Sequence, residues 1–173
     1  MTEIKDNELT FEKVYESIYA PNDPTIKDAN LLLLPYQNFR DGIDYCFTEY
    51  AEEFLGYINQ SGEKTVKADI AITDDKYQVI EMHSMLLDIG IVILTNAVLP
   101  VALGLLTNYV YDKLKKLHEG KENVNVRVEF ISQSENGVSK SIRYDGPASE
   151  LETIKDSVKE IPHSIQAARN MVE

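Results

Sequence analysis

Asp69, Glu81 and His83 are the side chains of this 173-residue sequence whose types and spacing best suit chemistry. Apolar residues alternate with polar ones over residues 66–72 and again over residues 77–82, after a short polar turn, which predicts a β-hairpin. Residues two apart on a strand point the same way, so Glu81 and His83 project together and Asp69 could meet them across the pair. An exposed acidic hairpin with a hydrogen-bonded histidine would show the same pattern without any chemistry.

The predicted hairpin resembles the catalytic hairpin of the restriction-endonuclease-like, or PD-(D/E)xK, superfamily. In that family an acid begins one strand, and an acid, a spacer and a lysine close the next, holding a divalent metal that activates water for phosphodiester cleavage. The resemblance implies that Asp69 and Glu81 are metal carboxylates, that His83 takes the lysine position, and that Mg²⁺ or Mn²⁺ is the cofactor. It covers roughly half of the chain, residues 45–132, where a helix, the hairpin, a long helix and a strand follow in the family's order.

The sequence also departs from that family at positions that matter for catalysis. His83 replaces the usual lysine, and Ala68 stands where proline is common. An inactive descendant used for binding therefore agrees with the pattern as well as a metal-dependent nuclease does.

The charge of the chain is strongly negative and unevenly distributed. Its 17 Lys and Arg against 29 Asp and Glu give a formal charge of −12, which argues against general binding to nucleic-acid backbones. Up to Asp88 there are 7 basic and 18 acidic side chains, a net charge of −11, and the remainder carries −1. The acidic half could face a basic partner, hold a divalent metal, or serve solubility alone.

The single cysteine, Cys46, cannot form an internal disulfide, and no apolar stretch near Met1 follows a basic start as a secretory signal would. We therefore expect a cytoplasmic protein with a buried thiol, because no base that could activate Cys46 lies nearby in sequence. The Lys and Asn usage is compatible with a low-GC bacterium or its phage.

The segment Ile89–Val110 contains no charged residue and predicts one long apolar helix, kinked or broken near Pro100. It is long enough to cross a bilayer, although Asn96 and Asn108 would be costly in lipid. A buried helix apolar on all sides must be covered by its own chain or by a second copy, which favours self-association. The alternative is a small membrane-associated effector that uses helix 89–110.

The remaining patterns predict ordinary elements of a single domain, residues 1–173. Thr48 and Glu49 begin a helix that ends before Gly62, and Asn136-Gly137 joins two alternating strands into a second hairpin. We divide the domain into an N-terminal helix and linker (1–28), a core (29–162) and a C-terminal tail (163–173). The other predicted elements are a helix at 9–19, a strand at 29–34, strands at 124–130 and 138–144, and a helix capped by Ser149 and Glu152 that ends at Pro162.

Together these elements predict an α+β fold in which a mixed or antiparallel sheet with two β-hairpins packs around one long central apolar helix. The function expected from this fold is that of a non-catalytic, acidic protein-protein interaction or assembly subunit without a cofactor. Its predicted contact surface is a cluster of aromatic residues in a segment rich in turn residues, which could equally belong to the core: Tyr36, Phe39, Tyr45 and Phe47.

Overall fold

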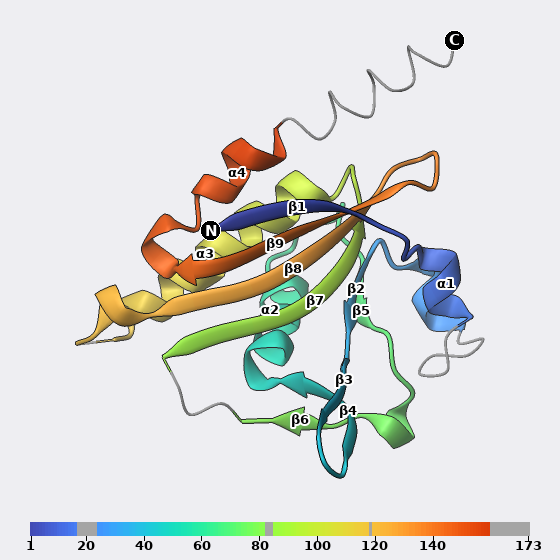
Figure 1. The fold of residues 1–173 in the computed structure, drawn as a ribbon, viewed down its shortest axis with the longest axis horizontal. Helices are drawn as coiled ribbons and strands as arrows, with labels where there is room; N and C mark the ends of the chain where they lie inside the picture. Colours follow the sequence, from blue (N-terminus) through green and yellow to red (C-terminus); the bar gives the residue numbers. More distant parts are fainter. Residues whose placement is uncertain (17–23, 82–84, 118, 160–173) are drawn as a thin grey trace.

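The computed structural model describes residues 1–16, 24–81, 85–117 and 119–159, and its centre is a six-stranded mixed sheet (Figure 1). From one edge to the other, the strands are β1 (Thr2–Asn7), β9 (Ser139–Pro147), β8 (Asn125–Gln133), β7 (Leu86–Thr95), β2 (Leu31–Leu34) and β5 (Ala68–Ile70). A second sheet contains the short strands β3 (Tyr36–Arg40), β4 (Ile43–Thr48) and β6 (Val79–Ile80). The fold class is therefore α+β, as the sequence predicts.

Helices cover one face of the main sheet, where α2 (Glu49–Gln60) and α3 (Leu99–Lys115) lie side by side (Figure 1). Helix α4 (Thr153–Val158) packs against α3 and β1, whereas α1 (Phe11–Tyr15) lies near the other end of the strands. The remaining short helices are η1 (Pro24–Asp28), η2 (Asp74–Lys76), η3 (Lys121–Asn123) and η4 (Ala148–Glu150).

The two faces of β8 and β9 differ sharply in polarity. Val128 and Phe130 of β8 and Ile142 of β9 are fully buried, while the alternate positions Arg127 and Arg143 are exposed. This alternation is typical of an antiparallel pair with one face on the core and the other facing water. The open face of the sheet is consequently lined by charged side chains.

The prediction of one long apolar helix over Ile89–Val110 is wrong. Residues Leu86–Thr95 form strand β7, the chain turns at residues 96–98, and α3 begins at Leu99. A strand buried on both faces has a continuous apolar run, which periodicity alone cannot distinguish from a buried helix. Pro100 lies in the first turn of α3, where it fits without a kink. A sheet rather than a helix therefore forms the centre of the molecule.

Strand β7 is the interior strand that connects the two halves of the main sheet. It pairs antiparallel with β2 and parallel with β8, and the parallel connection runs through α3. At 17 residues, α3 is the longest helix of the described chain, and none of the described helices has the length and apolar character needed to cross a membrane.

The predicted hairpin over residues 66–82 does not form. Strand β5 pairs parallel with β2, placing Asp69 beside Leu32, whereas β6 pairs parallel with β4 in the second sheet. The alternating patterns identified strand-forming residues but not their partners, because helix α2 returns the chain so that β5 lies parallel to the buried β2.

Several local predictions are confirmed. The side chain of Thr48 caps α2 by accepting a hydrogen bond from the N–H of Ala51 at 3.0 Å, and β2 lies within residues 29–34. The β8–β9 hairpin forms around Gly137, whose φ of +79° only glycine adopts readily.

Other predictions fail or fall outside the described chain. The capping box of Ser149 and Glu152 is absent, since α4 starts without a side-chain cap. Helix α1 occupies only part of the range 9–19, and the tail 163–173 lies outside the described residues. The sequence analysis predicted neither β1 nor the β3–β4 hairpin, and β1 makes residues 1–28 more than a helix and linker.

We predict that Gly90→Ala destabilises the protein by about 1–2 kcal/mol, because Gly90 has a φ of +86° at the irregular position of β7. Gly104 is the matched control: it lies inside α3 with open space where an added methyl group would go, so Gly104→Ala should stabilise by about 0.5–1 kcal/mol. Urea unfolding of both variants measures the difference, and unchanged stability of Gly90→Ala would contradict this account.

Candidate functional site

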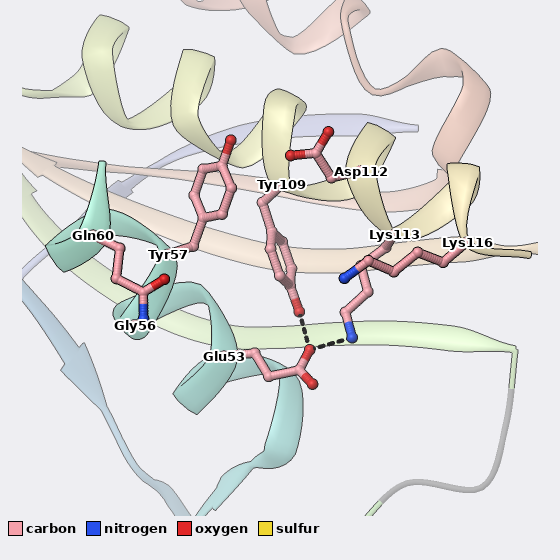
Figure 2. A pocket seen from close by; sticks show the side chains of 8 residues that line it. All are labelled: Glu53, Gly56, Tyr57, Gln60, Tyr109, Asp112, Lys113 and Lys116. Atoms are coloured by element: carbon pink, nitrogen blue, oxygen red, sulfur yellow. Dashed lines mark hydrogen bonds and ion pairs between the residues drawn. The ribbon is translucent and has the colours of Figure 1, made fainter. Parts of the chain in front are cut away.

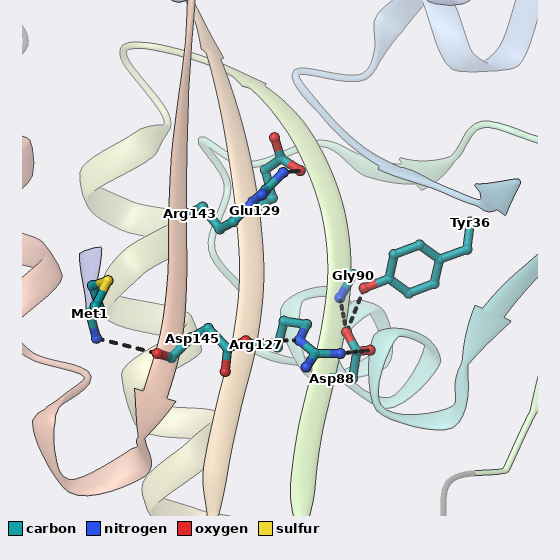
Figure 3. Close-up of polar contacts among 8 residues, drawn as sticks. All are labelled: Met1, Tyr36, Asp88, Gly90, Arg127, Glu129, Arg143 and Asp145. Atoms are coloured by element: carbon teal, nitrogen blue, oxygen red, sulfur yellow. Dashed lines mark hydrogen bonds and ion pairs between the residues drawn. The ribbon is translucent and has the colours of Figure 1, made fainter. Parts of the chain in front are cut away.

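The most deeply buried charged group of the described chain is the carboxyl of Asp88, whose side chain is only 2% exposed (Figure 3). Its Oδ1 accepts hydrogen bonds from the hydroxyl of Tyr36 at 2.7 Å and from the N–H of Gly90 at 3.0 Å. Its Oδ2 lies 3.8 Å from Nη1 of Arg127. The register of β7 with β8 shifts between Asp88 and Gly90, and this bulge lets the N–H of Gly90 reach the carboxylate of Asp88 two residues earlier.

The contacts of Asp88 extend to four further elements. Arg127 also contacts Asp145 of β9, with 3.2 Å between Nε and Oδ2. The main-chain oxygen of Asp88 accepts a hydrogen bond from the hydroxyl of Thr48, the residue that caps α2. One buried residue thereby connects β3, β8 and, through Arg127, β9 to the start of α2.

The surroundings of Asp88 act on the pKa of its carboxyl in opposite directions. Burial raises the pKa of this carboxyl, and the hydrogen bond from Tyr36, the charge of Arg127 and the N–H of Gly90 offset only part of the rise. Burial and the neighbouring Asp88 raise the pKa of Tyr36 in turn, so its phenol stays protonated and keeps donating. Since Asp88 is 1% exposed, this group connects elements and offers no opening to a substrate.

We predict that Asp88→Ala lowers the free energy of unfolding by about 2–4 kcal/mol, because Tyr36 and Gly90 lose a buried acceptor. Asp88→Asn retains an acceptor oxygen and should cost less.

The raised pKa of Asp88 also predicts how stability depends on pH. The folded state holds the proton of this carboxyl more tightly than the unfolded state does, so the stability gained from the proton is complete at low pH and is lost as pH rises through the raised pKa. The free energy of unfolding of the wild type, relative to that of Asp88→Asn, should therefore fall with rising pH across the acid range. Chemical denaturation of both proteins at several pH values measures this difference. A difference that stays constant with pH would contradict the interpretation.

A second candidate is an open pocket of about 390 Å³ between α2 and α3 (Figure 2). Glu53 lines it and accepts a hydrogen bond from the hydroxyl of Tyr109 at 2.7 Å, and its carboxylate pairs with the ammonium of Lys113 at 2.5 Å. Burial acts to raise the pKa of Glu53, but these two donors outweigh it and lower the pKa. The pocket is lined by Glu53, Gly56, Tyr57, Gln60, Tyr109, Asp112, Lys113 and Lys116. With two carboxylates and two ammonium groups, its lining selects no sign of charge.

The structure does not gather the residues predicted for metal chemistry on one hairpin. Asp69 is half-buried in β5, where its Oδ1 accepts a hydrogen bond from the N–H of Ile70 at 2.8 Å. Glu81 is exposed after β6, and His83 lies outside the described residues. Within the described ranges, no three His, Cys, Asp or Glu side chains come together as a metal site. Metal binding by Asp69, Glu81 and His83 stays a prediction without support from this geometry.

The predicted aromatic surface falls on the β3–β4 hairpin, which extends away from the main sheet (Figure 1). Tyr36, Phe39 and Tyr45 are partly exposed, and the rings of Tyr36 and Phe39 are 5.9 Å apart. Phe47 is only 3% exposed and belongs to the core, so it does not line a surface. The guanidinium of Arg40 lies 5.2 Å from the ring of Phe39.

The thiol of Cys46 is buried, as the sequence predicts, and burial raises its pKa. A thiol that is both buried and protonated is a poor nucleophile. Cys46 therefore has a packing role on β4.

The sequence analysis missed the group around Asp88, although a signal was present. Asp88 is the last charged residue before an uncharged run, and Gly90 follows two positions later. A lone acid entering a buried strand beside a glycine indicates a bulge with a buried carboxylate, but only once that run is assigned to a strand.

Comparison with known proteins gives no family to which the chain can be assigned: no family model, no curated protein and no solved structure matches it.

Proposed function

We propose that this protein is a non-catalytic interaction subunit that binds a protein partner through its β3–β4 hairpin. The observation that carries the proposal is the pairing of partly exposed Phe39 with Arg40 on a hairpin standing clear of the main sheet. Aromatic and arginine side chains dominate the binding energy of protein interfaces, because they bury a large area while keeping a polar contact.

The backbone of β3 helps to present these side chains. Asn38 has a φ of +52°, and the pairing of β3 with β4 is irregular between Gln37 and Arg40. Asparagine tolerates this left-handed conformation better than most residues. The bulge fixes the local direction of Phe39 and Arg40, so little conformational freedom remains to be lost on binding.

The charges around the hairpin indicate the chemistry of the partner. Asp41 and Asp44 are exposed on the hairpin, and Asp74 and Asp75 are exposed in η2, directly before the strand that pairs with β4. An acidic rim around an aromatic centre suits a basic protein surface with an apolar pocket, which it would also attract over a distance.

We expect Phe39→Ala combined with Arg40→Ala to weaken binding to the partner at least about tenfold, because truncating central aromatic and arginine contacts commonly costs more than 1 kcal/mol each. The partner is first captured from the source cells with the wild-type protein, identified by mass spectrometry, purified and measured by isothermal titration calorimetry. Affinity should also fall with rising salt concentration.

The matched control is Val138→Ala, which shortens an exposed apolar side chain on the β8–β9 turn, far from the hairpin in sequence. Binding by this variant should equal that of the wild type. Equal affinity of the Phe39/Arg40 variant, at unchanged melting temperature, would refute the hairpin as the contact surface.

A further inference from the structure

Strand β1 is an edge of the main sheet in the described part of the chain, with β9 as its neighbour. The ammonium of Met1 donates to the main-chain oxygen of Asp145 at 3.3 Å, and the N–H of Asp145 donates to Met1 at 3.2 Å. Bonded and non-bonded pairs alternate along an antiparallel ladder, so Glu3, Lys5 and Asn7 also bond to β9. Thr2, Ile4 and Asp6 consequently direct their N–H and C=O groups away from the sheet.

The other edge of β9 confirms this alternation. The N–H of Ala148 donates to the main-chain oxygen of Val124 at 2.9 Å, and the N–H of Ser134 donates to that of Val138 at 2.8 Å. The backbone groups of the even-numbered residues of β9 therefore point toward β8, and those of the odd-numbered residues point toward β1. Among the described residues, the outward groups of β1 therefore form a row of donors and acceptors without a strand partner, with Ile4 at its middle.

The side chains of β1 carry both signs of charge around one apolar residue. Ile4 is 39% exposed. Glu3 and Lys5 flank it on the opposite face of the strand and pair with each other, with 2.6 Å between Oε1 and Nζ. Asp6 pairs with Lys140 of β9.

We propose that a second copy of this chain pairs with β1 along this edge, antiparallel and about a two-fold axis at Ile4. In this register Ile4 lies opposite Ile4 of the second copy and Thr2 lies opposite Asp6, so every outward group meets an outward group. The two six-stranded sheets then form one continuous sheet. This inference goes beyond the hairpin function, because it concerns a different strand and a different partner.

Charge complementarity selects both the partner and the register. About the axis at Ile4, Glu3 of each copy lies directly opposite Lys5 of the other, which gives two favourable cross-strand pairs. Sliding by two residues in one direction places Glu3 opposite Glu3, and sliding in the other direction places Lys5 opposite Lys5. Slips by a single residue mismatch the hydrogen-bonding groups. The strand is thus complementary to itself in one register.

The test uses charge reversal and analytical ultracentrifugation of the untagged full chain. We expect the wild type to dimerise and Glu3→Lys or Lys5→Glu to raise the dimer dissociation constant at least about tenfold, because each reversal creates two like-charged pairs. An equal mixture of the two variants should form a one-to-one heterodimer, and the double variant Glu3→Lys with Lys5→Glu should dimerise again.

A second variant separates loss of pairing from loss of folding. Ile4→Pro removes an N–H that points away from β9, so the β1–β9 ladder keeps its bonds, while the centre of the interface loses two hydrogen bonds because both copies carry the substitution. We expect this variant to be folded by circular dichroism and monomeric by analytical ultracentrifugation. A monomeric wild type would overturn the proposal, and so would a dimer that none of these substitutions weakens. The Phe39/Arg40 variant should still dimerise and Glu3→Lys should still bind the partner, so the two proposals fail independently.

Discussion

The fold depends on a buried carboxylate at the point where β7 bulges. One carboxylate oxygen of Asp88 accepts hydrogen bonds from the hydroxyl of Tyr36 and the N–H of Gly90, and the other faces Arg127. Its main-chain oxygen accepts a hydrogen bond from Thr48, the capping residue of α2. Burying such a group costs free energy unless its hydrogen bonds are satisfied. Apart from the bond from Gly90, which belongs to the same strand, the contacts of Asp88 reach β3, β8 and the start of α2, so the cost of burial is offset fully only when these elements occupy their native places together. The carboxylate thereby favours one arrangement over other compact ones.

The position of the β3–β4 hairpin follows from the same group. The hairpin belongs to the small second sheet, and the hydroxyls of Tyr36 and Thr48 both link it to Asp88 of β7. The ring of Tyr36 lies close to Gly90, where an added methyl group would come within 3.8 Å of it, and the ring of Phe39 lies beside that of Tyr36 at a tilt of 32°. The orientation of Phe39 and Arg40 therefore rests on a chain of contacts that begins at the bulge. The proposed contact surface is thereby preorganised, which would limit the entropy lost on binding.

Sequence patterns revealed the features that depend on neighbours along the chain and missed those that depend on distant partners. Thr48 as a cap and Asn136-Gly137 as a turn act within a few residues, and both could be predicted. The choice between helix and strand over residues 89–95 is made by tertiary packing, because this run is buried whichever it forms. The partners of β5 and β6 are set by the return of α2 to the sheet. Strand β1 has one apolar side chain among charged ones, so its pairing with β9 leaves no hydrophobic signal.

The two proposed contact surfaces differ in how their charges are arranged, and this difference separates their roles. The hairpin and the adjoining η2 expose four carboxylates (Asp41, Asp44, Asp74 and Asp75) against two cations (Arg40 and Lys76), so the surface has a net negative charge that would attract a basic partner more than a second copy. Strand β1 instead alternates the signs of its charges about a central residue, an order that a two-fold axis converts into opposite pairs. A surface with a net negative charge favours a different, basic molecule, whereas a balanced and symmetric edge favours its own copy. Paired through β1, each dimer would carry two hairpins, so a partner with repeated basic sites would be held by both at once and would dissociate more slowly than from a single copy.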